Sequence, residues 1–136
     1  MIDRDAIVAE ARSMIGTPWH HQGRLPGVGL DCIGLVVCVL ERLGYTAKDR
    51  YGYRRAPVPA EFIAAVREQA TEKPIDQMAK GDMLLIAPGK LLQHAAIYSG
   101  NDTIIHARTK AAVEEVTLGL LRTKVRHCFD LSSLNG

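Results

Sequence analysis

The run Asp31-Cys32-Ile33 contains the side chain in this sequence that is best suited to nucleophilic chemistry. Cys32 opens a nearly unbroken apolar stretch, residues 32–43, which predicts a buried helix. A thiol in the first turn of a helix faces unpaired backbone N–H groups, which favour the thiolate and lower the thiol pKa. The same groups can donate to an oxyanion beside the sulfur. Cys32 is therefore the candidate nucleophile for attack on a carbonyl carbon.

A thiol nucleophile needs a base that later returns the proton to the leaving amine, and histidine suits both steps. His94 and His106 lie in apolar runs on either side of a turn sequence at 99–102. In a hairpin centred on Gly100, the two histidines would be directly opposite each other on one face. Their Cβ atoms would then be about 4.5–5.5 Å apart. The pattern predicts two imidazoles within hydrogen-bonding reach.

Other candidate residues have ordinary interpretations as well as functional ones. Cys38 lies mid-helix among valines and Cys128 in an alternating apolar run, so both fit small buried hydrophobic residues. His20 and His21 are predicted either at the surface or in the wall of a cleft next to Cys32. The loop at 50–55 mixes arginine with tyrosine. It is predicted to be a solvated loop or the rim of a site for an acidic substrate.

Periodicity predicts helices in the first half of the chain and strands in the second. The expected helices are residues 3–15, 32–43 and 59–70, and the expected strands are residues 82–87, 92–98, 103–108, 113–118 and 124–131. Residues 16–29 contain glycines and prolines without a period and are predicted to be an ordered loop. We therefore expect one α+β domain, residues 1–136, with N-terminal helices packed on a C-terminal antiparallel β-sheet.

Composition excludes several classes of protein. The formal net charge of +2 is too small for a sequence-independent nucleic-acid binder, so no nucleic-acid partner is expected. Three cysteines in 136 residues indicate free thiols rather than a disulfide framework. The amino terminus is polar and lacks the layout of a secretory signal, and no apolar run reaches the length of a membrane span. Synthesis in the cytoplasm and no membrane association are expected.

Five segments, in this order, resemble the successive motifs of the NlpC-type cell-wall cysteine peptidases. They are GTPW at 16–19, LDCIGLV at 30–36, KGDMLL at 80–85, QHAAIYSG at 93–100 and IIHA at 104–107. The sequence is similar in particular to the compact members encoded in prophages and gene-transfer-agent clusters.

The resemblance implies a reduced papain-like fold and hydrolysis of bacterial peptidoglycan stem peptides, typically at the bond from γ-D-glutamate to diaminopimelate or lysine. By position, Cys32 is the nucleophile, His94 the general base and acid, and His106 the residue that orients His94. No metal or organic cofactor is implied. The resemblance to phage-like members suggests tail or baseplate proteins as partners. It also suggests action in the periplasm or cell wall after delivery in a particle.

Two positions depart from the pattern of this family. Trp19 stands where tyrosine is common, so an indole N–H or the neighbouring His20 would replace the hydroxyl at the oxyanion or substrate. Ile33 stands where a serine often helps to bind a free amino terminus of the stem peptide. The expected substrate contacts are Trp19, His20, Asp31 and Ile33. The expected substrates are stem peptides still attached to glycan.

Two alternatives to a cysteine peptidase follow from the same residues. Cys32, His94 and His106 are all competent zinc ligands, and catalytic zinc uses three protein ligands and a water. The sequence has no short ligand pair such as His-Glu-x-x-His, which disfavours a zinc hydrolase. A non-catalytic particle component that binds peptidoglycan or plugs a tail is the second alternative. The free thiol at the helix start and the two histidines argue against it.

Overall fold

The computed structural model describes residues 2–46, 49, 53–54, 57–92 and 94–134. Most of the loop at 50–55 lies outside the described residues, so the prediction of a solvated loop or an acidic-substrate rim stays a prediction. Within the described ranges, no helix is long and apolar enough to cross a membrane.

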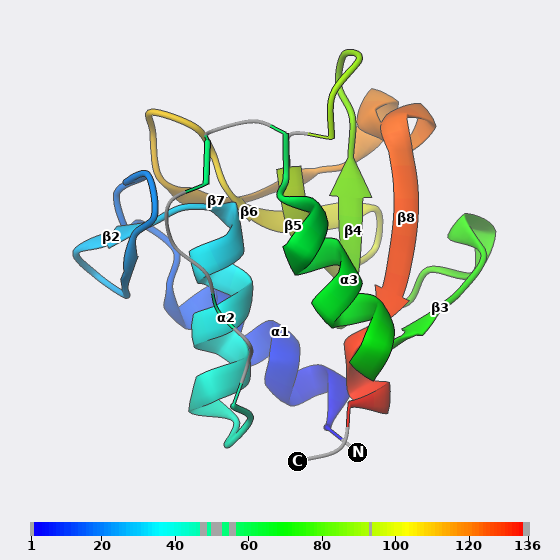
Figure 1. Ribbon diagram of the computed structural model, residues 1–136, viewed down its shortest axis with the longest axis horizontal. Helices are drawn as coiled ribbons and strands as arrows, with labels where there is room; N and C mark the ends of the chain where they lie inside the picture. Colours follow the sequence, from blue (N-terminus) through cyan, green and yellow to red (C-terminus); the bar gives the residue numbers. More distant parts are fainter. Residues whose placement is uncertain (1, 47–48, 50–52, 55–56, 93, 135–136) are drawn as a thin grey trace.

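Among the described residues, three helices occupy the first half of the chain, as the periodicity predicted (Figure 1). They are α1 (Arg4–Ser13), α2 (Cys32–Arg42) and α3 (Ala60–Gln69). Helix α2 is buried from Ile33 to Leu40, because its side chains are apolar around nearly the whole circumference. It packs against α1 and against the sheet, so it is the central element of the helical layer.

A six-stranded sheet forms the second layer, in the order β3-β8-β4-β5-β6-β7 (Figure 1). Its strands are β3 (Thr71–Glu72), β4 (Asp82–Ile86), β5 (His94–Gly100), β6 (Thr103–Ala107), β7 (Val113–Thr117) and β8 (Val125–Asp130). All neighbouring pairs are antiparallel. The 3₁₀ turns are η1 (Ile75–Gln77), η2 (Gly119–Lys124) and η3 (Leu131–Ser133). Helices packed on an antiparallel sheet confirm the predicted α+β fold.

Apolar side chains cover both faces of the sheet. Ala95, Ile97 and Ile105 belong to the main core, which also contains the buried faces of the helices. Tyr98 and Ile104 belong to a second cluster on the other face. Alternate residues of a strand point to opposite faces, so the central strands are buried on both sides. This double burial holds β5 and β6 rigidly beside α2.

A two-stranded hairpin, β1 (Arg24–Leu25) with β2 (Gly29–Leu30), lies within the segment predicted to be a loop. The prediction missed it because its strands are too short for any periodicity. The hairpin segment packs directly on α2, where a Cβ added at Gly34 would lie 2.0 Å from the carbonyl oxygen of Gly23. Only glycine permits such a close approach of two backbones.

The register of the β5–β6 hairpin differs from the prediction. Ile97 pairs with Ile105, so Ala96, and not His94, lies opposite His106. Asn101 and Asp102 form a tight turn with φ values of 51° and 59°, and the register shifts between Tyr98 and Gly100. The ladder is thereby displaced by two residues from the predicted one. A displacement by an even number keeps the faces, so His94 and His106 are diagonal neighbours on one side.

A buried carboxylate near the start of β4 ties α1 to the sheet. Asp82 is completely buried, and its oxygens lie 2.9 Å from Nη1 of Arg4 and 2.8 Å from Nζ of Lys73. The backbone N–H of Ala79 donates to the same carboxylate at 2.8 Å. A carboxylate removed from water in this way is stable only while these partners remain.

We expect Asp82→Asn to lower the free energy of unfolding by about 3 kcal/mol, because Arg4 and Lys73 would lose the charge that compensates them. Asp5→Asn is the matched control. Asp5 pairs with Lys80 but its side chain is 73% exposed, so its loss should cost less than about 1 kcal/mol. Urea unfolding followed by circular dichroism measures both variants. Equal losses in the two would contradict this account of Asp82.

Candidate active site

Cys32 is the first residue of α2, as predicted, and its side chain is partly exposed. Asp31 caps the helix, with Oδ1 accepting the backbone N–H of Gly34 at 2.8 Å. Both other cysteines of the chain, Cys38 and Cys128, are buried. The cap fixes where the helix begins, and it therefore fixes the position of the one thiol that a substrate or reagent reaches directly.

The prediction of a lowered pKa for Cys32 is wrong, because the helix start does lower this pKa but burial raises it by more. Burial raises the pKa of Cys32 to about 11, and the negative charge of Asp31 acts in the same direction. Backbone hydrogen bonds from Ala95, Ile33 and Cys32 itself lower the pKa but do not offset the burial. The thiol of the free protein therefore stays protonated at neutral pH, and a base has to remove its proton.

His94, the first residue of β5, has the properties of such a base. Its ring meets that of His106 edge to face, with centroids 5.8 Å apart and an interplanar angle of 88°. Burial lowers the pKa of His94 from its ordinary value, and the neighbouring His106 lowers it as well. His94 is therefore neutral at pH 7 and free to accept a proton.

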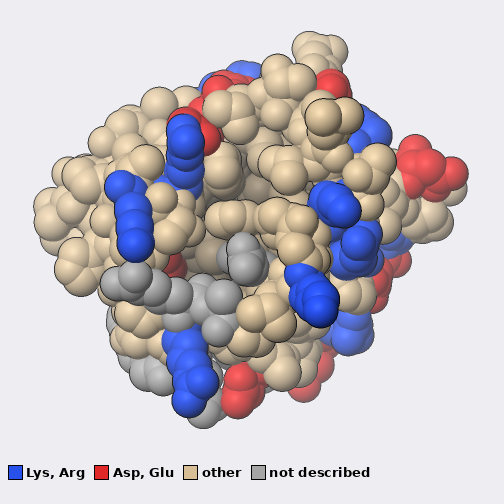
Figure 2. Space-filling model, turned by 90° about the horizontal axis from the view of Figure 1, so that it is seen from above, with Lys and Arg blue, Asp and Glu red and all other residues tan. Residues whose placement is uncertain are grey.

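Cys32 and His94 line the same cleft, together with Trp19. The cleft is a slit of about 20 Å³. A cavity of about 220 Å³ adjoins it and shares the side chains of Ile33 and Tyr53. Figure 2 views the end of the molecule at which α2 begins, and Lys and Arg side chains stand around its hollowed central part. The thiol and the imidazole thus lie together at the narrow end of a larger depression.

Glu114 is part of this site, although the sequence did not single it out. It lies on β7 directly opposite His106, and its Oε2 is 2.8 Å from Nε2 of His106. The hairpin that joins β6 to β7 is centred on Lys110. A register prediction for this second hairpin would have found the pair.

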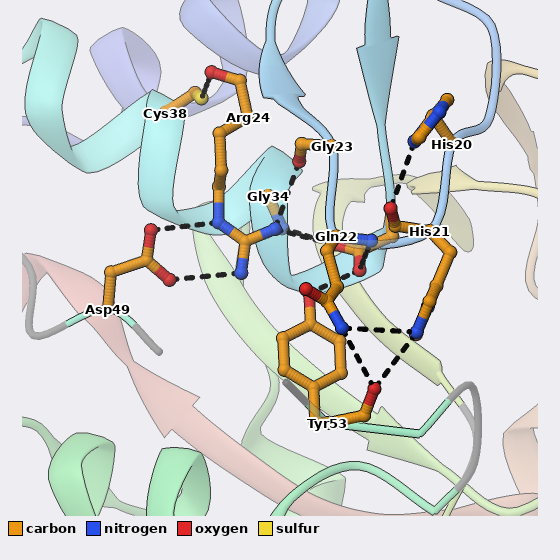
Figure 3. A network of polar contacts seen from close by, with 10 residues as sticks. His20, His21, Gln22, Gly23, Arg24, Gly34, Cys38, Asp49 and Tyr53 are labelled. Carbon is orange, nitrogen blue, oxygen red and sulfur yellow. Dashed lines mark hydrogen bonds and ion pairs between the residues drawn. The ribbon is translucent and has the colours of Figure 1, made fainter. Parts of the chain in front are cut away.

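The carboxylate of Asp31 binds several groups at once, and its partners Gln22, Arg24, Gly34 and Tyr53 are labelled in Figure 3. Besides its bond to the helix, it accepts the backbone N–H of Gln22 at 2.9 Å and Nη1 of Arg24 at 3.1 Å. The hydroxyl of Tyr53 donates to the same carboxylate. Burial and the bond to Asp31 hold the pKa of Tyr53 well above its ordinary value, so the hydroxyl remains a donor. Asp31 is therefore committed to partners within the chain.

Arg24 connects this carboxylate to a second one. Its Nε and Nη2 lie 2.8 and 3.0 Å from the two oxygens of Asp49, and its guanidinium lies 5.6 Å from the centre of the Tyr53 ring. The thiol of Cys38 donates to the backbone oxygen of Arg24 at 3.3 Å. The β1–β2 hairpin is thereby attached to α2 through side chains as well as through glycine contacts.

Three of the four residues that are predicted to contact the substrate lie at the cleft. Trp19, Asp31 and Ile33 line it, but His20 does not. His20 is exposed and its Nδ1 lies 2.9 Å from the backbone oxygen of His21, while the ring of His21 turns toward Tyr53 (Figure 3). Nε2 of His21 lies 2.9 Å from the backbone oxygen of Tyr53, and its ring stacks on Trp19. His21, and not His20, lines the cleft.

The zinc alternative lacks a suitable cluster of ligands. Among the residues that the structure describes, which include Cys32, His94 and His106, no group of three His, Cys, Asp or Glu side chains is placed to hold a metal ion.

Comparison with known proteins identifies the family. A model of the NlpC/P60 family matches residues 16–127. The chain belongs to the NlpC/P60 family. The predicted enzyme class is thereby confirmed, since the members of this family are cysteine peptidases of the bacterial cell wall.

Solved structures of NlpC/P60 proteins share the fold. The NlpC/p60 domain of the peptidoglycan hydrolase SagA is 27% identical with a TM-score of 0.69, over 96% of this chain and 100% of that one. An NlpC/P60 family protein from Bacillus cereus is 20% identical with a TM-score of 0.70, over 94% of this chain and 40% of the other. The peptidoglycan hydrolase RipB from Mycobacterium tuberculosis is 18% identical with a TM-score of 0.71, over 98% and 65%. No curated protein sequence matches the chain.

We expect iodoacetamide to modify Cys32 before Cys38 and Cys128, because Cys32 is the partly exposed thiol and the other two are buried. The rate at Cys32 should continue to rise above pH 9, since its pKa is raised to about 11. Peptide mass spectrometry after timed quenching gives the rate at each cysteine. Equal rates at all three, or a plateau below pH 8, would contradict the described environment of Cys32.

Proposed function

We propose that this chain hydrolyses peptide bonds in the stem peptides of bacterial peptidoglycan, with Cys32, His94 and His106 as its catalytic triad. The observation that carries the proposal is that the thiol at the start of α2 shares a cleft with a neutral imidazole, whose ring contacts a second imidazole. The family match and the names of SagA and RipB as peptidoglycan hydrolases support the choice of substrate.

In the proposed mechanism, His94 removes the proton of the Cys32 thiol as the sulfur attacks the carbonyl carbon of the scissile bond. Backbone N–H groups beside the sulfur stabilise the oxyanion of the tetrahedral intermediate. The His94 imidazolium then gives its proton to the leaving amine, and a thioester remains on Cys32. Water attacks the thioester with His94 again as base, which releases the carboxylic acid and restores the thiol.

We propose the bond from γ-D-glutamate to diaminopimelate or lysine as the one cleaved, in stems that are still attached to glycan. Binding of a free amino terminus would require an unoccupied acceptor near the cleft. Asp31 is already bound by Arg24 and Tyr53, and Ile33 offers no hydroxyl. These two features favour a substrate whose amino end is acylated.

The proposed setting is a phage-like or gene-transfer-agent particle, in which the protein is a tail component delivered to the cell wall. Its support is the sequence similarity to compact prophage-type members. Co-purification of the protein with intact particles of its producing strain would test this setting, and its absence from washed particles would refute it.

We expect Cys32→Ala to abolish release of peptide fragments from purified sacculi, with an unchanged circular dichroism spectrum. Cys38→Ala is the control, because it removes a thiol of the same helix outside the cleft and should retain activity. Mass spectrometry identifies the fragments and the bond cleaved. Undiminished release by Cys32→Ala would refute the proposed role. Faster cleavage of free stem tetrapeptides than of glycan-linked stems would refute the proposed substrate form.

The acid limb of the activity profile should lie below pH 6.5. His94 has a lowered pKa, so it stays unprotonated and able to act as a base until the pH falls below its ordinary value. The same sign applies to the contribution of His94 to the free energy of unfolding. The unfolded chain binds this proton at higher pH, so the contribution is complete above about pH 6.5 and declines as the pH falls. Initial rates of muropeptide cleavage between pH 4 and 8 measure the limb. A midpoint above pH 7 would contradict this expectation.

A further inference from the structure

Glu114 is the charged group nearest to the histidine pair that the proposed triad leaves without a role. Its Oε2 lies 2.8 Å from Nε2 of His106, and its Oε1 lies 3.7 Å from Nη1 of Arg108. The Glu114 side chain is 31% exposed, whereas that of His106 is 11% exposed. The carboxylate thus lies at one end of a series of side chains that runs from Cys32 through the two histidines to Glu114.

We propose that Glu114 is a positioning residue, which fixes the tautomer and the ring orientation of His106 and through it assists His94. The proposal rests on the proposed function, because His94 is the base in that mechanism. Glu114 itself touches neither the substrate nor the thiol.

Donor and acceptor capacity determines the tautomer of His106. An ionised carboxylate can only accept, so Nε2 of His106 must carry the hydrogen in the bond to Glu114. In neutral His106, Nδ1 is then left without a hydrogen and is an acceptor. A glutamate directly opposite in the β6–β7 ladder also limits rotation of the ring. The ring that contacts His94 is therefore held in one tautomer and one orientation.

Glu114 assists His94 electrostatically. His94 becomes an imidazolium each time it takes the proton of Cys32, and that charge forms next to His106. A negative charge bonded to the far nitrogen of His106 polarises its ring and stabilises the imidazolium. Histidine rings are commonly oriented and made more basic by a carboxylate bonded to the other nitrogen. Glu114 provides this arrangement from the side of the sheet opposite to α2.

His94 lines two clefts, and charged or titratable residues line each of them as well. The narrow cleft holds Cys32, and a groove of about 520 Å³ holds His106 and Glu114. The titratable and charged residues that line the two are His21, Asp31, Cys32, Tyr53, Arg54, His106, Arg108 and Glu114. Among these, Glu114 is the carboxylate that contacts the second histidine. Its removal should therefore change the titration of His94 in a predictable direction.

The test compares Glu114→Gln with Glu115→Gln. Glu115 is the next residue of β7, faces away from Glu114 and pairs with Arg12 at 3.0 Å, so it matches the change in charge and shape outside the site. Nitrogen-15 NMR of the histidine rings reports the tautomer of His106 without any substrate. Iodoacetamide modification of Cys32 and muropeptide cleavage, both measured as a function of pH, report the effect on His94.

We expect wild-type His106 to carry its hydrogen on Nε2, and Glu114→Gln to populate the Nδ1–H form, because an amide can donate where the carboxylate could only accept. Cleavage should fall about tenfold in Glu114→Gln, and the acid limb should move to lower pH, since the imidazolium of His94 loses stabilisation. Glu114→Asp should restore the acid limb in part. Glu115→Gln should leave the tautomer, the rate and the profile unchanged.

An unchanged His106 tautomer in Glu114→Gln would overturn the proposal, and so would equal losses of cleavage in Glu114→Gln and Glu115→Gln. A fall in melting temperature with an unmoved acid limb would also overturn it, because it would reveal a purely structural ion pair. The NMR result is independent of the proposed function. If Cys32→Ala retained activity, the proposed mechanism would fail, while the tautomer would still decide how Glu114 acts on His106.

Discussion

The carboxylate of Asp31 is the interaction on which the site depends. It caps the helix that begins with Cys32, and it also accepts from Gln22 and Arg24 of the preceding hairpin segment and from Tyr53, which follows 22 residues later. A buried carboxylate that loses its partners is costly, so the hairpin, the loop around Tyr53 and the helix start must assemble together. The position of the thiol is therefore a property of this assembly, and not of the helix alone.

Opposing effects on two pKa values determine how the thiol and the imidazole work together. The helix start lowers the pKa of Cys32, but burial is larger and raises it to about 11, while burial lowers the pKa of His94. In both residues the apolar surroundings favour the uncharged form. The resting pair is neutral, and charge appears only when the proton moves. Donors around the sulfur and Glu114 behind His106 then become useful, because each stabilises a charge that forms during the reaction.

Periodicity in the sequence predicted the helices and the main strands. It could not predict strand register or side-chain partners, which depend on individual residues. The apolar circumference of 32–43 predicted a buried helix with Cys32 at its start, and alternation predicted the main strands. The β5–β6 register could not be read from the turn sequence, because Asn101 and Asp102 shift the ladder by two residues. Glu114 was identified only from the structure, in which it lies on β7 opposite His106. The sequence does not distinguish His20 from His21 as the cleft wall, because both lie in one loop without periodicity.

The protonated state of Cys32 has a consequence for durability. Peroxide and other oxidants react with the thiolate far faster than with the thiol, and over-oxidised cysteine cannot be recovered by simple reductants. With its pKa raised to about 11, the sulfur of the resting protein carries almost no thiolate at neutral pH. The narrow slit limits access further, and the two other cysteines are buried. The same environment that makes the nucleophile dependent on a base therefore preserves it chemically in an oxidising medium.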